Sequence, residues 1–507
     1  MGLKDFTIYD YISRNAKIFA DRESIVFNDN RLTHKQFKEK CDQVAAGLIK
    51  IGVARGDRLA VVAHNCDEFM ILYGAAAKMG AIVLPVNWRF QQNEVEFVLN
   101  DCTPKFAFAG PDYFQTLKTA LPGCRSIEKC FALGGKDQSG EFTPFAELYV
   151  EDGAEEEFDI PADSGFVIIH TAAVAGEPRG ALLSQGNVVA ANFPAMTRGG
   201  LGPDDCHICI LPLFHVAGLS LSMATMHAGG KNVIVERFDP ELTLKLIQQE
   251  RGTIFFHFAP ILSMLVEKCK GGDFDLSSLK NIQGMDSPDN IMAFCKYAPN
   301  AQVGTGFAQT EAMGVTGGLA KDRPGSAGRP TIISNVRLFD DYDREVPVGA
   351  PGEICVRSPA VFLGYWGRDE DNAYTFRNGW HHTGDIGRFD EEGFLWYVKR
   401  KAEKELIKPG GENVYPAEVE KVILEHEAVA EVSVIGVADD QWGEAIKAVV
   451  VFKAGMSVEP DKLIEFVATK IARYKKPKYV DVVDTLPKTG DGEIDRDQVK
   501  KDHGGKY

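Results

Sequence analysis

The sequence has no excess of positive charge and no long apolar run. Its 507 residues include 56 Lys and Arg against 72 Asp and Glu, a formal net charge of −16. Binding to nucleic acids or anionic membranes depends mainly on Lys and Arg attracting phosphates, so this acidity argues against both. No segment approaches the roughly 18 consecutive apolar residues of a membrane-spanning helix, and the first residues lack the apolar core of a signal peptide. We expect a cytoplasmic protein without a transmembrane segment that binds nucleotides only in local pockets.

Cysteine is absent after residue 355. The 10 cysteines are scattered from Cys41 to Cys355, unlike the dense framework of a secreted disulfide-rich protein. Cys206 and Cys209 form a C-x-x-C pair, but a structural zinc site needs a second closely spaced pair, which the sequence lacks. We therefore expect reduced thiols that serve mainly in packing.

The first 400 or so residues alternate apolar runs with amphipathic segments. Residues 57–65, 66–80 and 81–87 have the patterns of a strand, a helix and a strand, an order typical of parallel α/β folds. Helical and strand patterns recur at 241–250 and 253–260. Short strands and turns around 340–358 predict an antiparallel or barrel-like section. The fold class predicted is α/β, with a large N-terminal body of α/β subdomains plus a β-rich section.

Composition changes after Arg400, where lysine and glutamate crowd a polar connector. We place the domain boundary there, with residues 1–400 forming the large body and 401–507 a small mobile C-terminal domain. The latter contains helical patterns at 416–426 and 460–474 and strand patterns at 430–439, 445–453 and 479–484. This mixture predicts an α+β unit of about 100 residues, long enough to fold alone.

Two segments combine small residues with polar groups. In TAAVAGEPRG, residues 171–180, backbone N–H groups could converge on an anion beside Arg179, although the segment is not a P-loop and a plain surface turn is the alternative. In GTGFAQTE, residues 304–311, Thr310 and Glu311 offer oxygen ligands for Mg²⁺. The alternative there is a strand-end turn with a helix cap at Thr310.

Two later segments add further polar groups. Asp385 in HTGDIG could accept both hydroxyls of a ribose while Arg400, on the next predicted strand, donates to the same sugar. The alternative is a hairpin with polar turn residues. The loop containing Gly410 and Gly411 leads into a helix primed by Pro416 and could pass close to a ligand, or it could serve only as a linker turn.

Together, the order and spacing of these segments resemble the adenylate-forming superfamily, which contains acyl-CoA synthetases, adenylation domains of peptide synthetases and luciferase. The resemblance covers essentially the whole chain. It includes the phosphate loop at 171–180, the Thr-Glu segment at 306–312, the Thr-Gly-Asp at 383–385 and the Gly-Gly-Glu loop at 408–420. GMDSP at 284–288 resembles the segment beside adenine, and LPLFHVAGL at 211–219 resembles the segment bordering the acyl pocket.

The resemblance implies an AMP-forming acyl-CoA synthetase that uses ATP, Mg²⁺ and CoA. A small-molecule carboxylic acid would attack the α-phosphate of ATP to give an acyl-adenylate, and CoA would then displace AMP after rotation of the C-terminal domain. The resemblance is also compatible with a homodimer. The apolar character of residues 214–217 and Phe307 suits an aliphatic, alicyclic or aromatic acid.

The family's functional positions map onto named residues of this chain. The implied catalytic residues are Thr310, Glu311, His215, Glu493 and Lys488, with Glu311 holding Mg²⁺. The implied nucleotide-binding residues are Thr171, Gly176, Arg179, Gly284, Met285, Asp286, Gly306, Phe307, Ala308, Gln309, Thr310, Asp385 and Arg400. The implied CoA loop contains Gly410, Gly411 and Glu412, and the implied acyl pocket contains Phe214, His215, Val216, Ala217 and Gly218.

Two segments depart from the family pattern. The phosphate loop has alanines and a valine where the family has hydroxyl side chains, and Arg179 replaces its lysine. Each lost hydrogen bond to a charged group removes about 1.5–3 kcal/mol of binding. Glu493 stands where the family has the lysine that contacts the carboxylate and α-phosphate during adenylation. A charge pair near 4 Å at an effective dielectric of 20 contributes about 4 kcal/mol, so replacing the lysine with glutamate changes the electrostatic energy substantially.

Three interpretations of Glu493 remain open at this stage. A nearby lysine could substitute, with Lys488 the first candidate and Lys475 or Lys476 next. The protein could be specialised for the thioester step, which does not use this loop. It could also be a non-catalytic relative that binds nucleotide or acyl-CoA.

Overall fold

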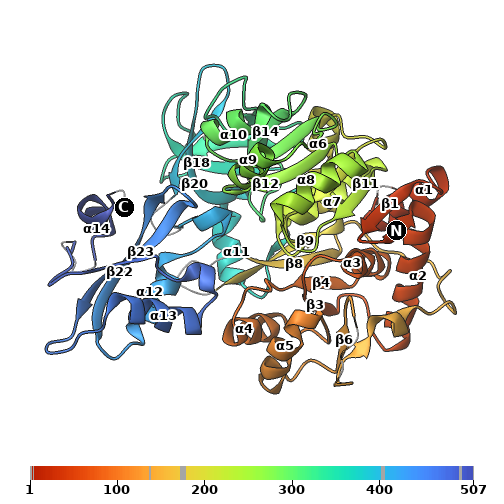
Figure 1. Ribbon diagram of the computed structural model, residues 1–507, viewed down its shortest axis with the longest axis horizontal. Coiled ribbons are helices and arrows are strands. Elements are labelled where there is room, and N and C mark those ends of the chain that lie inside the picture. Colours follow the sequence, from red (N-terminus) through yellow and green to blue (C-terminus); the bar gives the residue numbers. More distant parts are fainter. Residues whose placement is uncertain are drawn as a thin grey trace.

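A computed structural model describes residues 3, 5–135, 137, 139–171, 178–400, 406–489 and 494–505. Figure 1 shows a large body, formed by the described residues up to 400, and a smaller C-terminal unit beside it that begins at residue 406. The N-terminus lies on the body and the C-terminus on the smaller unit. Among the described helices, none is long and apolar enough to cross a bilayer.

The body contains two large sheets. In the described part of the chain, eight strands form the first, in the order β19 (Gly364–Tyr365), β9 (Arg179–Ser184), β8 (Gly165–Thr171), β4 (Ile82–Pro85), β3 (Arg58–Val62), β5 (Phe106–Ala109), β6 (Lys129–Ala132) and β7 (Thr143–Pro144). Parallel pairing joins β8 to β4 and runs on to β7, whereas β9 and β19 pair antiparallel. The predicted strands around 57–65 and 81–87 are therefore confirmed.

Nine described strands form the second sheet. Their order is β16 (Arg329–Pro330), β15 (Thr316–Leu319), β14 (Gln302–Phe307), β13 (Asn281–Met285), β12 (Ile254–Phe258), β10 (Cys206–Cys209), β11 (Lys231–Ile234), β1 (Glu23–Phe27) and β2 (Asn30–Thr33). Its central strands are parallel, from β1 through β11, β10, β12 and β13 to β14. Parallel sheets of this kind have helices on both faces.

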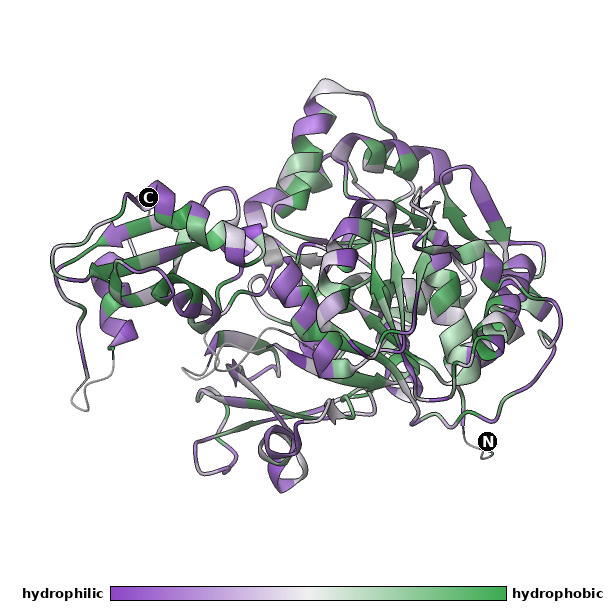
Figure 2. Ribbon diagram, turned by 90° about the horizontal axis from the view of Figure 1, so that it is seen from below, coloured by the Kyte–Doolittle hydropathy of each residue, from purple (hydrophilic) through white to green (hydrophobic). Residues whose placement is uncertain are grey.

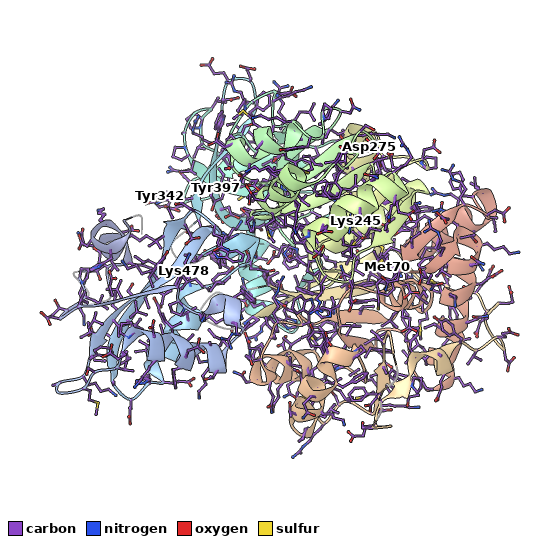
Figure 3. The ribbon with its side chains drawn as sticks, in the orientation of Figure 1. Met70, Lys245, Asp275, Tyr342, Tyr397 and Lys478 are labelled. Atoms are coloured by element: carbon purple, nitrogen blue, oxygen red, sulfur yellow. The ribbon has the colours of Figure 1, made fainter. Side chains whose placement is uncertain are left out.

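Helices cover the two sheets, and the largest hydrophobic core combines residues of both sheets with helices between them. Met70 of α3, labelled in Figure 3, is 1% exposed in that core. Figure 2 shows the same arrangement as apolar strands within a more polar exterior. The α-helices of the body are α1 (Ile8–Ile18), α2 (His34–Lys50), α3 (Asp67–Met79), α4 (Gln92–Cys102), α5 (Phe114–Ala120), α6 (Gln185–Gly199), α7 (Val216–Ala228), α8 (Pro240–Glu250), α9 (Ile261–Gly271), α10 (Pro288–Cys295) and α11 (Asp369–Thr375).

Local sequence explains where several helices begin and end. Thr7, Thr33 and Ser184 each accept a backbone N–H of the first turn of α1, α2 and α6, as N-cap residues do. Gly80 and Gly229 end α3 and α7 in the left-handed conformation that favours glycine. Short 3₁₀ helices in the body are η1 (Pro111–Tyr113), η2 (Leu121–Gly123), η3 (Phe145–Leu148) and η4 (Arg377–Gly379).

The β-rich section predicted around 340–358 is confirmed as an antiparallel sheet. In the described residues it has four strands in the order β17 (Asn335–Phe339), β18 (Gly352–Arg357), β20 (His381–Phe389) and β21 (Leu395–Arg400). Asp385 of β20 lies opposite Arg400 of β21 in the register. The pairing of these two strands therefore brings together two residues that the sequence analysis assigned to one sugar.

The C-terminal unit is built on the antiparallel strands β22 (Val429–Asp439) and β23 (Gly443–Phe452), with β24 (Tyr479–Val482) parallel to β23. One face packs against α12 (Pro416–Leu424) and α13 (Pro460–Lys470), and the other carries a separate cluster that includes Val499 of α14 (Arg496–His503). The 3₁₀ helices here are η6 (Pro409–Gly411) and η7 (Arg473–Lys475). In the described structure, each hydrophobic cluster lies either in the body or in this unit.

Cys206 and Cys209 are buried free cysteines on β10. Residues three apart on a strand point to opposite faces of a sheet, and the two side chains belong to different hydrophobic clusters. This arrangement fits the packing role predicted for them.

Candidate active site

A cavity of about 350 Å³ opens between the two large sheets. The carboxyl ends of the parallel strands β12, β13 and β14 lie at one sheet edge, where Phe258, Met285 and Phe307 line the cavity. Thr171 at the end of β8 and Arg179 at the start of β9 line it from the other sheet. Crevices at the carboxyl ends of parallel strands are where α/β proteins bind ligands.

Glu311 lies in the loop after β14 and is surrounded by hydroxyl groups. Its Oε1 accepts hydrogen bonds from Thr171 Oγ1 at 3.0 Å and from the Tyr365 hydroxyl at 2.9 Å. Thr310 and Glu311 both line the cavity, and Thr310 precedes no described helix, so the helix-cap alternative is wrong. Carboxylate and hydroxyl oxygens are hard donors of the kind that Mg²⁺ binds, so these residues fit that ion.

Arg179 is held beside the same group. Its guanidinium lies 4.0 Å from the centre of the Tyr365 ring, and Nη1 is 3.4 Å from Asp371 Oδ1. Its Nε is buried and makes no hydrogen bond to a described residue. Arg179 therefore brings a positive charge to the cavity wall, as the sequence analysis expected. Tyr365, which fixes both Arg179 and Glu311, lies in no motif that sequence reasoning identified.

Asp385 forms the centre of a second polar cluster. It is 1% exposed, and its Oδ1 lies 2.9 Å from Arg400 Nε and 3.4 Å from the hydroxyl of Tyr397, labelled in Figure 3. Gln309 donates through Nε2 to the other carboxylate oxygen of Asp385 and to the Thr383 carbonyl. These contacts tie the loop after β14 to the β20–β21 hairpin. A buried, fixed carboxylate of this kind suits the binding of sugar hydroxyls.

Only part of the segment expected beside adenine lines the cavity. Gly284 and Met285 line the cavity, together with Gly306, Phe307 and Ala308. Gly284 has φ +148°, and a Cβ there would collide with the His257 carbonyl, so only glycine fits. Asp286 does not line the cavity. Its Oδ1 accepts from the Ser287 N–H and the Asn290 amide at the start of α10, so motif membership misplaced this side chain.

His215 lies where the large cavity meets a second one of about 60 Å³. It is the N-cap of α7, with Nδ1 accepting the Ala217 N–H at 3.1 Å, so the neutral ring carries its proton on Nε2. Burial lowers the pKa of His215, which favours this neutral form. Both cavities are lined by Thr171, His215, Thr310 and Asn413.

The other residues expected in the acyl pocket separate into two groups. Val216 and Ala217 line the large cavity. Phe214 lines the smaller cavity instead, because its side chain points to the opposite side and packs edge-on against Trp88. Gly218 lines neither cavity, and a Cβ there would collide with the Pro212 carbonyl. The expectation that Phe214 and Gly218 line the same pocket as Val216 is therefore wrong.

The glycine loop of the C-terminal unit approaches the body. Glu412 lines the smaller cavity and forms an ion pair with Arg89 of the body, which sequence reasoning missed. Gly410 has φ +60° and donates its N–H to the Trp442 carbonyl at 3.0 Å. Gly411 completes the same 3₁₀ turn, η6. The loop thus reaches the smaller cavity through Glu412, whereas Gly410 provides the turn.

Lys408, which lies in this loop, is another cation that sequence reasoning missed. It lines the large cavity with Tyr415 and Arg400, and the Arg400 guanidinium donates to the Tyr415 hydroxyl at 3.4 Å. Burial and the nearby charge of Arg400 lower the pKa of Lys408. Its position directly before the Pro-Gly-Gly turn was the sequence signal that could have identified it. The cavity thus gathers positive charge on a chain that is acidic overall.

Lys488 lies far from these groups in the described structure. It forms an exposed ion pair with Glu431 at 2.7 Å and lines neither cavity. Lys475 is buried between Glu94 and Glu418, and Lys476 pairs with Glu465. Gly176 and Glu493, as well as the connector 401–405, lie outside the described residues.

Comparison with known proteins agrees with this geometry. The sequence profile of the AMP-binding enzymes matches residues 12–366, and that of the AMP-binding enzyme C-terminal domain matches 418–493. An indoleacetate–CoA ligase of Aromatoleum aromaticum is 31% identical over 504 residues, covering 97% of both chains. A feruloyl-CoA synthase of an Amycolatopsis species is 31% identical over 499 residues, covering 97% of this chain and 98% of the relative.

Solved structures show the same fold. A double mutant of o-succinylbenzoate CoA synthetase from Bacillus subtilis, bound with its product analogue, superposes with a TM-score of 0.84 at 26% identity, covering 98% of this chain and 99% of that one. The chain therefore belongs to the AMP-binding enzymes of the adenylate-forming superfamily. Within that family it is an acid–CoA ligase.

Proposed function

We propose that this ligase makes an acyl-CoA in two steps. A carboxylate oxygen of the acid attacks the α-phosphorus of ATP, the bond to the β-phosphate breaks, and diphosphate leaves. The sulfur of CoA then attacks the acyl carbon and loses its proton, and the bond between the acyl group and AMP breaks. The products are acyl-CoA, AMP and diphosphate.

The observation that carries this proposal is the continuity of the site. One cavity joins the polar groups around Glu311 and Asp385 to an apolar wall, and it shares His215 and Thr310 with a second, smaller cavity. Acid, nucleotide and thiol can therefore meet at one point from three directions. A site for a nucleotide alone needs neither the apolar wall nor the second cavity.

The nucleotide is assigned to the polar side. Asp385 accepts from the ribose hydroxyls with Arg400 beside it, and Gly284 and Met285 border the adenine. Thr171, Arg179 and Lys408 face the phosphates, where positive charge and hydroxyl donors stabilise the transition state. Thr310 and Glu311 would hold Mg²⁺, which would neutralise charge on the phosphate oxygens.

The acid is assigned to the apolar side. This wall contains residues of α6, α7 and β12, among them Ala195, Leu221, Phe256 and Phe258. Aromatic rings and small aliphatic side chains favour a flat or branched hydrophobic acid. The relatives described above are named for indoleacetate and ferulate, which are aromatic acids. We therefore infer an aromatic acid, with His215 against its reacting carbonyl and the thiol arriving through the smaller cavity.

The arrangement of the C-terminal unit suits the second step. Asn413 lines both cavities and Lys408 lines the large one, whereas Lys488 pairs with Glu431 away from them. We propose that residues 401–507 act as one mobile domain that rotates against residues 1–400 between the two steps, with the loop of Gly410 and Gly411 guiding the thiol.

A second candidate is a ligase specialised for the thioester step. The observation that favours it is Glu493, an acid where the family carries its adenylation lysine. Isotope exchange between diphosphate and ATP over a panel of acids separates the candidates. Acid-dependent exchange together with thioester formation supports the two-step ligase. Thioester formation from preformed acyl-adenylate without exchange supports the specialised enzyme, and failure of both reactions would refute the ligase proposal.

A further inference from the structure

One face of α6 forms a wall of the large cavity along its length. Ala191, Pro194, Ala195, Arg198 and Gly199 line the cavity at the spacing of a single helical face. From residue 191 to residue 198 this face extends roughly 10 Å. Pro194, about halfway along the face, contacts Gly314, three residues after Glu311. Arg198 lies near the C-terminal end of the face.

The strands opposite α6 run the same distance. On β14 the lining extends from Phe307 back to Gly304, and on β15 it extends from Thr316 to Leu319. Four residues of an extended strand also span about 10 Å. Arg198 lies against Gly317 of β15, where a Cβ would collide with its guanidinium. Gly317 pairs with Gly306 of β14, so this glycine makes room for the cation along the strand wall of the cavity.

Arg198 differs from the other arginines that line the cavity. Arg179 pairs with Asp371 and Arg400 pairs with Asp385, whereas Arg198 makes no hydrogen bond or ion pair with any residue that the structure describes. Among the described lining residues, the only carboxylate is Glu311. Arg198 is exposed to solvent, and burial of part of its side chain lowers its pKa.

A second donor lies beside Arg198. The amide nitrogen of Gln283 is 3.8 Å from the position that a Cβ would occupy on Gly199, the residue that follows Arg198. Gln283 lines the cavity and, within the described chain, its side chain makes no hydrogen bond. Arg198 and Gln283 are therefore two donors that line the same cavity and make no hydrogen bond within the described chain.

We propose that Arg198 is a specificity-determining residue that binds a second anionic group on the acid, away from the carboxylate that reacts. This inference rests on the proposed function and names its substrate class, which is acids with a carboxylate at each end and an apolar body between them. A guanidinium binds a carboxylate through two parallel hydrogen bonds, and Gln283 can donate a third. The reacting carboxylate stays at Glu311 and His215.

The test compares matched acids in the thioester assay. The pairs are octanoic against octanedioic acid, and hydrocinnamic acid against its para-carboxy derivative, with the para-hydroxy derivative as a neutral acceptor. The enzyme variants are Arg198→Met, which keeps the apolar stem, and Arg198→Lys, which keeps the charge. Arg337→Met, which removes a surface arginine of β17 paired with Glu345, is the control. Thermal unfolding verifies that each variant folds.

We expect the wild type to favour each diacid by at least tenfold in kcat/KM over its partner. Arg198→Met should remove that preference while leaving the monoacids within about threefold, and Arg198→Lys should retain part of it. Gly317→Ala, which displaces the guanidinium without removing it, should lower the diacid rate more than the monoacid rate. Arg337→Met should change neither.

Other outcomes overturn the inference. An unchanged ratio between diacid and monoacid in Arg198→Met would show that Arg198 is a solvated surface residue. An equal gain from the para-hydroxy and para-carboxy groups would show that the site does not select an anion. Monoacids that react well in either case leave the proposed function intact, whereas the absence of thioester from every acid would remove the proposed function itself.

Discussion

Lys475 Nζ lies 2.6 Å from Glu94 Oε1, and this ion pair joins the C-terminal unit to the body. The lysine also pairs with Glu418 of its own unit, and the Ala472 N–H donates to the second oxygen of Glu94 at 2.8 Å. Lys475 is buried, so both contacts are shielded from water. The sequence analysis considered Lys475 as a substitute for the adenylation lysine, but in this arrangement it serves as a contact between the two parts.

Breaking this contact should slow the thioester step more than adenylation. We expect the double variant Glu94→Gln/Lys475→Met to form thioester from preformed acyl-adenylate about tenfold more slowly, because losing about 1.4 kcal/mol in one arrangement shifts its population tenfold. Diphosphate exchange should change less. The double variant keeps Glu94 from being left as a buried charge, and Glu418→Gln is added to it so that Glu418 is not left without its cation either. Lys476→Met, which removes an exposed pair with Glu465 in the same unit, is the matched control. Equal slowing of both steps would argue against a role in the arrangement.

Loss of the Asp385 carboxylate should weaken ATP binding. Asp385→Asn removes two charged acceptors for the ribose and the partner of Arg400, so KM for ATP should rise about 10- to 100-fold. KM for the acid should change little, since Asp385 lies on the nucleotide side. Tyr397→Phe removes only a 3.4 Å contact to the same carboxylate and serves as the control. A normal KM for ATP in Asp385→Asn would contradict the assignment.

A lysine at position 493 should raise the rate of adenylation. Glu493→Lys replaces a repulsion with an attraction toward the phosphate, so we expect diphosphate exchange to rise roughly tenfold or more. Lys488→Met tests the substitute suggested by the sequence, and it should lower exchange if Lys488 supplies the missing charge. Thioester formation from preformed adenylate reports on the other step and should be unaffected by both changes. An unchanged or lower exchange rate in Glu493→Lys would show that another residue has taken over this role.

Buried histidine should make the fold sensitive to acid. Burial lowers the pKa of His257 from 6.5 to about 3, and neither ring nitrogen hydrogen-bonds to a described residue. Between pH 6.5 and pH 3, His257 is therefore protonated in the unfolded chain but neutral in the folded one. The contribution of His257 to the free energy of unfolding is fully present above pH 6.5 and is lost progressively as the pH falls toward 3.

The variant His257→Leu isolates this contribution. Between pH 7 and pH 4.5 the Tm of this variant should fall less than that of the wild type, because unfolding takes up one fewer proton. Parallel curves for the wild type and His257→Leu would contradict the expectation.

The sequence predicted most of the fold because its strands and helices carry clear periodic patterns. It also predicted that Asp385 and Arg400 lie together, since adjacent strands of a hairpin share a register. Asp286 and Gly218 were misplaced because a motif locates a segment of backbone but does not fix where each side chain points. Tyr365 and Arg198 were missed because long-range packing alone brings β19 and α6 to the site, and no local pattern records it.

The two cavities that share His215 and Thr310 have a kinetic consequence. In the proposed function the acid occupies the large cavity and the thiol the smaller one, so saturation with one should not exclude the other. The acyl-CoA product would occupy both, with its acyl part in the large cavity and its thioester sulfur toward the smaller one. We therefore expect acyl-CoA to inhibit competitively against acid and against CoA, and its departure to be a slow step of the cycle.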